Sequence, residues 1–510
     1  MTNKKQILLN IIANAFAMIV STGINFFLTP YITKTVGVAA YGFVPLASNF
    51  VSYVAIITTA FNSMAGRFIT VALQQENQQE AGEYFSTVFF MNLILAVVTG
   101  TIFTFVLTFL TKIIHVPAEL TADIVILFAL SFASAVFSLI MNVFASATFC
   151  KNRLDLKSVV SMIGTVVRTV LLVALYALFP AKVYFLGIAN ISVNLVEGFS
   201  NLAIQRKIMP ELRVERKKFR IEHIRTLFAS GVWNSVSQLS SILMTGLDLL
   251  VANIYINATD SGILSIAKIM PSLLYTGVAL FVSAFGPQFV IDYAGHKDSR
   301  ALLGTMDFSA KLISFCSVIP VAGFIGFGKE FFLLWVPEQD AQLLMVLAAL
   351  TMIGDAVSYP VKAFDNIFAA VNRLRWPAIA TLTCGLLNVA MMIPLLRYTN
   401  WGLYAVAGTS TILLATKDLF FQIPYIAKLV KVNPWYFWKY VVKYAVSAAS
   451  IILNALLVKT MIPVSSWPLL ILDAAIVGCI ACIVNWFLLL DQPDRDALRM
   501  RLMQMVRRKR

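Results

Sequence analysis

Residues 84–111, YFSTVFFMNLILAVVTGTIFTFVLTFLT, form an apolar run of 28 residues without a charged side chain. As an α-helix this run is about 42 Å long, more than the roughly 30 Å of hydrocarbon in a bilayer. Similar runs of 23 to 31 residues fill most of the chain. The alternating ten-residue pattern of a β-barrel is absent, so helices are the predicted membrane-spanning elements.

The composition of the 510 residues agrees with this prediction. Hydrophobic residues make up 59% and charged residues 13%, and the mean hydropathy is +0.82, whereas soluble domains average roughly 45–50% apolar and 25% charged residues. The longest polar stretches, 72–84, 206–225 and 491–510, are too short to form a soluble domain. We therefore predict an all-α polytopic membrane protein with about fourteen transmembrane helices. These are expected at 7–32, 43–70, 84–111, 121–149, 157–180, 184–206, 226–255, 262–290, 304–328, 340–370, 376–398, 401–428, 436–460 and 467–490.

The distribution of basic residues predicts the orientation. With the N-terminus in the cytoplasm, 27 basic residues lie in inner loops and termini and 6 in outer loops. Such an excess on the cytoplasmic side is typical of multi-pass membrane proteins. It places both termini in the cytoplasm and accounts for the net charge of +15. A nucleic-acid partner is not expected, because the basic residues do not belong to a folded soluble domain.

The chain repeats itself with an offset of 220 residues. Asn14, Gly42 and Gly66 correspond to Asn234, Gly262 and Gly286, Val116-Pro117 to Val336-Pro337, and Asn152-Arg153-Leu154 to Asn372-Arg373-Leu374. Six helices lie between equivalent points, so the halves have the same orientation and are expected to be related by a pseudo-two-fold axis along the membrane normal. The expected domains are an N-terminal six-helix bundle (1–206), a basic cytoplasmic linker (207–225), a C-terminal six-helix bundle (226–428) and a region with helices 13–14 and the basic tail (429–510).

Ionisable residues inside membrane spans are costly and usually face a cavity or a partner. The candidate basic residues are Arg67, Arg168, Lys268 and Lys362, and the candidate acidic residues are Glu197, Asp248, Asp355, Asp365 and Asp418. A cavity holding the four basic residues would suit a phosphate or diphosphate, because arginine binds it bidentately and lysine as a point charge. The acidic residues would serve proton or sodium coupling, or pair with the basic ones.

Structural roles for the same charges stay open. Arg67, at the inner end of its helix, could extend to the membrane surface. Arg168 could pair with Glu197, Lys268 with Asp248, and Lys362 with Asp365 three residues later. Arg168 is the hardest to explain this way, since a guanidinium in mid-membrane needs an anionic partner.

No catalytic or metal site is expected. The three histidines lie apart at His115, His223 and His296, and the outer loops are short. Cys479 and Cys482 have CxxC spacing but lie in an apolar span without His or acidic neighbours, which favours a packing role. We expect neither a cofactor nor enzymatic activity, and a membrane polymerase or acyltransferase is the least favoured alternative.

Several short segments resemble a known family. Thr35-Val-Gly-Val-Ala-Ala-Tyr-Gly-Phe43 looks like the turn after helix 1 in the polysaccharide transporter family. Asp248 followed by Gly262 and Ala267 is similar to its helix 7–8 region, although Ile263 and Leu264 stand where a tyrosine is common. The segments 372–377 (NRLRWP) and 401–408 (WGLYAVAG) resemble its helix 10–11 junction and the start of helix 12. The family includes Wzx-type flippases and belongs to the superfamily of MATE exporters and the lipid II flippase MurJ.

The resemblance implies a flippase in the bacterial cytoplasmic (inner) membrane. It would move an undecaprenyl-diphosphate-linked oligosaccharide repeat unit to the outer leaflet by alternating access, for surface polysaccharide biosynthesis. Its partners would be the lipid-linked oligosaccharide, the bilayer, and possible polysaccharide polymerase and assembly proteins. The resemblance also gives Arg67, Arg168, Lys268 and Lys362 the role of binding the diphosphate and sugar. A MurJ-like lipid II flippase and a MATE-like cation-coupled exporter remain alternatives; the basic residues and helices 13–14 argue against the exporter.

Overall fold

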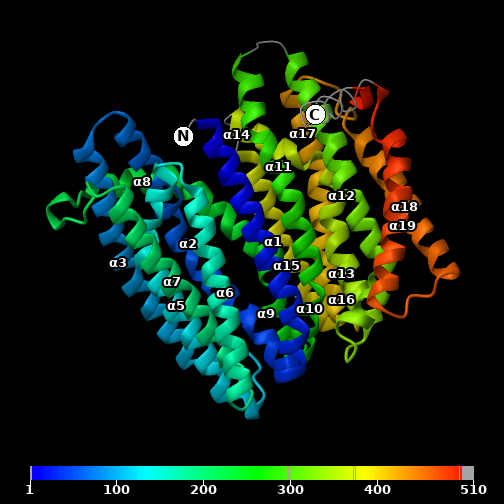
Figure 1. Ribbon diagram of the computed structural model, residues 1–510, viewed down its shortest axis with the longest axis horizontal. Coiled ribbons are helices and arrows are strands. Elements are labelled where there is room, and N and C mark those ends of the chain that lie inside the picture. The colour runs from blue at the N-terminus through cyan, green and yellow to red at the C-terminus, as the bar shows by residue number, and fades with distance from the viewer. Residues whose placement is uncertain (1–2, 296–298, 372, 374, 493, 497–510) are drawn as a thin grey trace, which may run out of the picture. The chain divides into compact units, whose positions relative to one another are not determined.

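Every segment that the sequence predicts to span the membrane is helical in the computed structural model (Figure 1), which describes residues 3–295, 299–371, 373, 375–492 and 494–496. No strand occurs among these residues. His296, Lys297, Asn372, Leu374 and most of the basic tail, which entered the predictions above, lie outside the described residues.

The helices form two compact units, Met1–Ile263 and Leu264–Arg510, within which contacts concentrate. The first unit contains α1 (Asn3–Val36), α2 (Val38–Gln74), α3 (Gln78–Thr108), α4 (Leu110–Ile113), α5 (Thr121–Cys150), α6 (Leu154–Leu178), α7 (Tyr184–Ile208), α8 (Ile221–Ser241), α9 (Asp248–Tyr255) and the start of α10 (Ala258–Ala267). The second contains α11 (Ile269–Gly295), α12 (Ser299–Trp335), α13 (Ala341–Ala356), α14 (Asp365–Ala370), α15 (Arg375–Tyr398), α16 (Leu403–Thr416), α17 (Ile423–Leu429), α18 (Trp438–Met461) and α19 (Trp467–Leu488).

Fewer helices than fourteen qualify as spans by length and apolarity alone. In the described part of the chain ten do, or up to twelve if each of two bent helix pairs is one span. The two further expected spans, 184–206 and 401–428, are helical but contain more polar residues. Asn190, Asn194 and Glu197 lie in α7, and Lys417 and Asp418 follow α16. The physical reason is that these two segments carry polar side chains that a lipid-facing helix would avoid.

Two of the expected spans are broken rather than continuous. In the first unit, the segment Ile221–Gly246 bends by 43° relative to Asp248–Tyr255, after the π-helical turn η3 (Ile242–Gly246). In the second unit, Ala341–Ala356 and Tyr359–Phe368 meet at 41°, and the 3₁₀ turn η4 (Tyr359–Phe364) follows the break. A seven-residue spacing predicts that Asp355 and Lys362 share one face of a continuous α-helix. Because the break lies between them, they do not.

Helices α8 and α9 pack within the first unit, although the repeat assigns them to the second half. Gly231 of α8 lies so close to α2 that an added Cβ would be 1.8 Å from the Ala60 carbonyl oxygen. Ser235 of α8 also donates to the Ile56 carbonyl at 2.8 Å. Close backbone approach through small residues is the usual means of joining helices in a membrane. The contacts thus divide the chain at Ile263, while the repeat-based boundaries at 206 and 226 stay a prediction.

The glycines of the Thr35–Phe43 segment have separate structural reasons. Gly37, between α1 and α2, has φ +87°, a conformation that favours glycine. Gly42 touches Gly262, its counterpart in the repeat, and a Cβ on Gly42 would lie 2.6 Å from the Gly262 Cα. These positions explain why a turn and a close contact here need residues without side chains.

The basic linker after α7 contacts the N-terminal part of α3. Arg220 pairs with Glu83 at 3.2 Å, and the Arg220 amide donates to the Thr87 hydroxyl at 3.0 Å. His223, which falls in the predicted linker 207–225, lies in the first turn of α8 and stacks on Tyr84 with ring centroids 3.9 Å apart. The segment joining α7 and α8 is therefore ordered against the first unit.

Candidate functional site: a polar cavity in the first unit

A cavity of about 820 Å³ lies inside the first unit, between α2, α3, α5, α6 and α7. Most side chains that line it are polar but uncharged, which is unusual for the interior of a membrane-embedded bundle. They comprise nine hydroxyls and four amides: Ser48, Thr58, Thr59, Ser63, Thr99, Ser131, Ser134, Ser138, Thr165, Asn62, Asn142, Asn190 and Asn194. Arg168 is the one charged residue among the lining residues.

The polar lining follows from helical periodicity. Ser131, Ser134, Ser138 and Asn142 recur at intervals of three and four along α5, so they form a stripe on one helix face. Residues of α2 face the same space, and Asn190 and Asn194 contribute from α7. A stripe of hydroxyl and amide residues in an otherwise apolar helix is a signal that was present in the sequence and that a search limited to charged residues does not detect.

Many of the lining hydroxyls donate a hydrogen bond to a backbone carbonyl of their own helix. Thr59 donates to the Ala55 carbonyl at 2.8 Å, Ser131 to Leu127 at 2.8 Å and Thr165 to Ser161 at 2.9 Å. A hydroxyl that donates to the backbone keeps its oxygen lone pairs as acceptors. The cavity wall is therefore rich in acceptors, and the amides add donors.

Arg168 lies near the middle of α6 at the edge of this cavity. Its Nη1 donates to Asn25 Oδ1 of α1 at 2.9 Å, while its Nε is buried without a partner among the described residues. Arg168 does not pair with Glu197, the bridge that the sequence left open; Glu197 lies on α7 beside Gly164. The described partners of this guanidinium are thus the Asn25 amide and the nearby Tyr41, both neutral, which leaves its charge uncompensated within the cavity wall.

The other candidates of the first unit lie elsewhere. Arg67 is an exposed residue of α2 and does not line the cavity. Asp248 is buried at the start of α9, after the break in that span. Near this break, Tyr53 and Asn49 of α2 donate to the Gly246 carbonyl at 2.7 and 3.1 Å. These bonds satisfy a carbonyl that the interrupted helix leaves available.

The other candidates of the second unit except Lys268 form, together with Lys417, a charge cluster, which we define as Asp355, Lys362, Asp365, Lys417 and Asp418. Lys362 and Asp365 form an ion pair at 3.4 Å, and Lys417 and Asp418 form another at 2.8 Å. Gln422 also donates to Asp365. Lys417 and Asp418 belong to the π-helical turn η5 (Lys417–Gln422), a type of irregularity frequent at functional sites.

Lys268 lies between α10 and α11 and is half-buried in the second unit. The four basic candidates are thus divided, with Arg67 and Arg168 in the first unit and Lys268 and Lys362 in the second. One cavity shared by all four stays a prediction. No group of three or more His, Cys, Asp or Glu residues in the described part of the chain is placed to hold a metal ion.

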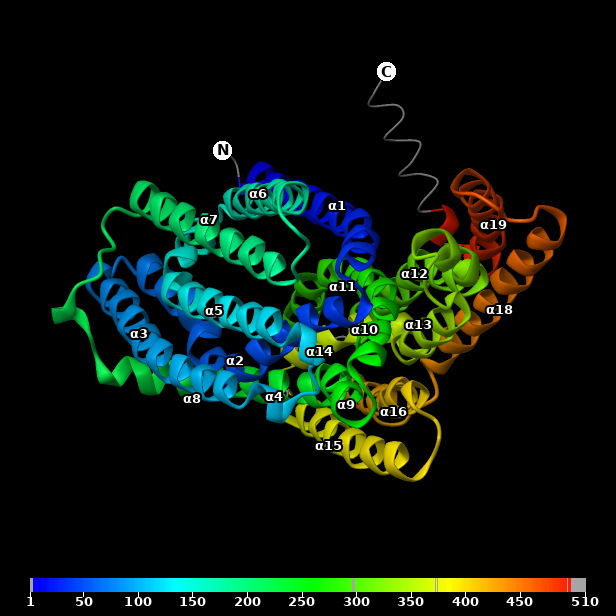
Figure 2. The same cartoon turned by 90° about the horizontal axis from the view of Figure 1, so that it is seen from below.

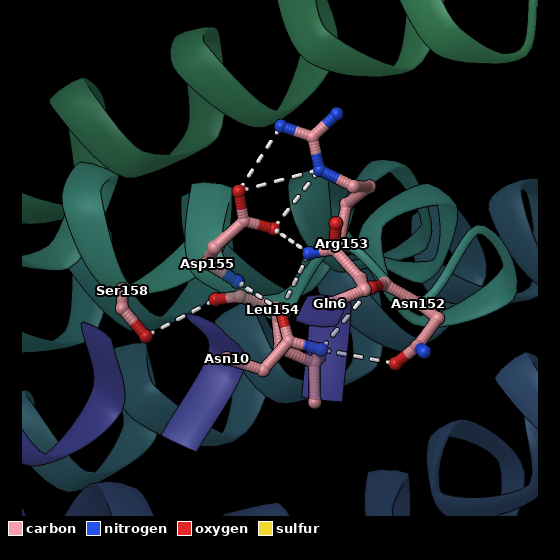
Figure 3. A network of polar contacts seen from close by, with 7 residues as sticks. All are labelled: Gln6, Asn10, Asn152, Arg153, Leu154, Asp155 and Ser158. Carbon is pink, nitrogen blue, oxygen red and sulfur yellow. Dashed lines mark hydrogen bonds and ion pairs between the residues drawn. The ribbon is translucent and has the colours of Figure 1, made fainter. Parts of the chain in front are cut away.

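A second polar network joins α1 to the turn between α5 and α6 (Figure 3). Gln6 donates to Asp155 at 2.9 Å, Asn10 donates to the Asn152 carbonyl at 3.1 Å, and the Asp155 amide donates to Asn10 at 2.9 Å. Arg153 pairs with Asp155 at 3.0 Å, and this hydrogen bond raises the pKa of Arg153. The network fixes the first turns of α1 against α6, and its side chains bond to one another, which indicates a structural role.

Comparisons with known proteins agree with this architecture. The sequence model of the family described as "Polysaccharide biosynthesis protein" matches residues 7–290. The uncharacterized membrane protein EpsK of Bacillus subtilis (strain 168) is 25% identical over 496 residues, covering 96% of each chain.

Solved structures are similar in fold at low sequence identity. The lipid II flippase MurJ, in an inward closed conformation, has a TM-score of 0.66 at 16% identity, with 94% of this chain and 98% of that chain covered. An inward-facing multidrug resistance MATE family transporter of the MOP superfamily has a TM-score of 0.65 at 16% identity, covering 81% and 94%.

The family match relates the chain to polysaccharide biosynthesis, and the solved structures show its fold. Because the family match covers more than half of the residues, the chain belongs to the polysaccharide biosynthesis protein family, and its fold is that of the MATE and MurJ transporters.

Proposed function

We propose that the protein is a flippase for an undecaprenyl-diphosphate-linked oligosaccharide repeat unit. It would act in the bacterial cytoplasmic membrane, with both termini in the cytoplasm, and move its substrate to the outer leaflet for surface polysaccharide biosynthesis. The observation that carries the proposal is the cavity of the first unit, which combines thirteen uncharged polar side chains with the single guanidinium of Arg168.

The chemistry of the cavity suits a glycosylated anion. Sugar hydroxyls donate hydrogen bonds, and the lining hydroxyls offer acceptor oxygens because their protons bond to backbone carbonyls. Moving a polar head group through the membrane requires that its polar atoms find partners, since an unpaired polar group in an apolar medium costs roughly 2–7 kcal/mol. The Arg168 guanidinium would pair with a phosphate in two parallel hydrogen bonds.

The proposed mechanism is alternating access. The head group would enter from the cytoplasmic side, cross in the polar cavity and leave to the outer side, while the hydrocarbon chain stays in the bilayer. Arg168 would offset the desolvation of the diphosphate during the crossing. A polysaccharide polymerase and assembly proteins would then take up the delivered unit.

The cavity argues against a cation exporter. Its lining residues include no acidic side chain, so a cationic drug would meet the positive charge of Arg168 without compensation. The acidic residues Asp355, Asp365 and Asp418 of the charge cluster remain candidates for ion coupling, although Asp365 and Asp418 each already face a lysine.

Deletion of the gene tests the proposal. We expect lipid-linked oligosaccharide to accumulate in the cytoplasmic leaflet and surface polysaccharide to disappear, and both to recover with the wild-type gene. Normal surface polysaccharide together with lost drug resistance would overturn the proposal in favour of an exporter. Accumulation of a peptidoglycan precursor instead would assign the protein to lipid II.

A further inference from the structure

An apolar groove of about 630 Å³ runs along the seam between α1 and α6, which lie side by side (Figure 2). Ile19, Gly23, Phe27 and Tyr31 of α1 line it at intervals of four residues, so they follow one face of the helix. Thr169 and Val173 line it from α6. From residue 19 to residue 31 the groove extends about 18 Å along α1, close to the hydrocarbon thickness of one leaflet.

The groove adjoins the polar cavity through Arg168. On α6, Thr165 and Arg168 face the cavity, while Thr169 in the next position lines the groove. On α1, Asn25 holds Arg168 at 2.9 Å from within the stretch that lines the groove. An apolar groove, a guanidinium and a hydroxyl-lined cavity thus follow one another across α6.

The hydrogen bonds between α1 and α6 concentrate at the base of this seam. The inner turns of α1 are fixed by Gln6 and Asn10 to Asp155. Further along the seam are the Asn25–Arg168 hydrogen bond and the edge-on contact of Tyr31 with Tyr176, whose ring centroids are 6.0 Å apart. Ile19 and Phe27 are largely exposed at the rim of the groove. A hydrocarbon chain would therefore cover apolar side chains that neighbouring helices of this unit leave open.

We propose that the α1–α6 groove binds the hydrocarbon chain of the lipid-linked substrate while its phosphate meets Arg168. This inference rests on the proposed function and adds the site of the lipid chain to it. The occupant must be a long chain that carries an anionic head group, since the groove is apolar and borders the uncompensated charge of the cavity. In the predicted orientation the groove lies in the outer half of α1, so it would hold the chain in the outer leaflet.

Gly23 offers a direct way to fill the groove. A Cβ added to Gly23 meets no atom within 4 Å, so a larger side chain would occupy the groove without a clash at the backbone. Gly100 of α3 is a matched control, because its Cβ position is equally open and it lines neither the groove nor the cavity. Gly23→Trp and Gly100→Trp therefore place the same side chain inside and outside the proposed site.

The test is binding of two diphosphates of different chain length to the purified full-length protein, measured by native mass spectrometry. We expect Gly23→Trp to weaken binding of undecaprenyl diphosphate about tenfold and to leave binding of geranyl diphosphate unchanged. Tenfold corresponds to about 1.4 kcal/mol, or roughly the burial of two methylene groups. Gly100→Trp should bind both as the wild type does, and Arg168→Gln should weaken both.

The outcomes separate the two proposals. If the wild type binds undecaprenyl diphosphate and Gly23→Trp binds it equally well, ordinary membrane lipid fills the groove and the inference is wrong. If the wild type binds neither diphosphate, the proposed function itself is overturned. Gly23→Leu is a second variant in case the tryptophan variant misfolds. A smaller loss of affinity that is confined to undecaprenyl diphosphate supports the groove. An equal loss of affinity for both diphosphates in both variants contradicts it.

Discussion

The polar cavity of the first unit and the charge cluster of the second unit differ in whether their basic side chains have an acidic partner. In the cavity, Arg168 lines the wall together with hydroxyl and amide residues, and its side-chain hydrogen bond goes to neutral Asn25. In the cluster, Lys362 and Lys417 face Asp365 and Asp418 at 3.4 and 2.8 Å. Uncompensated charge in a membrane is costly and is retained for function, whereas a compensated pair can be structural. The difference favours the cavity as the anion site.

Replacement of Arg168 should have the largest effect. We expect Arg168→Ala to lower export about 100-fold or more, since it removes the guanidinium that would pair with the buried phosphate, at a cost of roughly 2–5 kcal/mol. The measurement is surface polysaccharide in a deletion strain that carries the variant, with protein levels checked by immunoblot. Lys157→Ala is the control, because Lys157 is an exposed basic residue of the same helix that lies outside the cavity, and it should export nearly normally. Normal export by Arg168→Ala would mean that Arg168 only links α6 to Asn25.

In the charge cluster we expect a loss of stability rather than a selective loss of export. Asp418→Ala leaves Lys417 buried without its 2.8 Å partner, and breaking such a pair costs about 3–5 kcal/mol. The melting temperature of the purified protein should fall clearly. The double change Lys417→Met with Asp418→Leu should restore most of it, because it removes both charges together. A stable Asp418→Ala variant that has lost export would instead point to ion coupling.

The polar stripe of α5 should have an intermediate effect on export. Ser134→Val with Ser138→Val removes two lining hydroxyls, each worth roughly 0.5–1.5 kcal/mol as a hydrogen-bonding partner, so export should fall about tenfold. Ser146 of the same helix donates to the Val143 carbonyl and does not line the cavity. Ser146→Val is therefore the matched control, and an equal loss in both variants would contradict the role of the stripe.

The smallest effect is expected at Asn25. Asn25→Ala removes the hydrogen bond that holds Arg168 at 2.9 Å but keeps the guanidinium in place at the cavity. Export should stay within about threefold of the wild type, because this bond from a charged group, worth roughly 1.5–3 kcal/mol, holds α1 to α6 and does not contact the phosphate. A loss as large as that of Arg168→Ala would show that the position of the guanidinium, and not only its charge, depends on α1.

Sequence reasoning located the charged half of the candidate site better than the uncharged half. Arg168 was identified because a charge in mid-span is conspicuous. The hydroxyls of α2 and α5 were not, since serine and threonine are common in membrane helices and bond to their own backbone. The helix breaks at Gly246 and at Val357 were also missed: tertiary contacts such as those from Tyr53 and Asn49 to the Gly246 carbonyl stabilise one of them, and local sequence does not reveal such contacts.

By itself, the sequence determined the all-helical membrane architecture, because the length and apolarity of a helix decide whether it can cross a bilayer. It also predicted which charges lie within the helical spans. The local pair of Lys362 with Asp365 was already suggested by their three-residue spacing, but only the tertiary structure decided that Arg168 bonds to Asn25 and not to Glu197. The physical reason is that pairing depends on how helices rotate and approach one another. Contacts between small residues, such as Gly231 with Ala60, set that packing across long sequence separations.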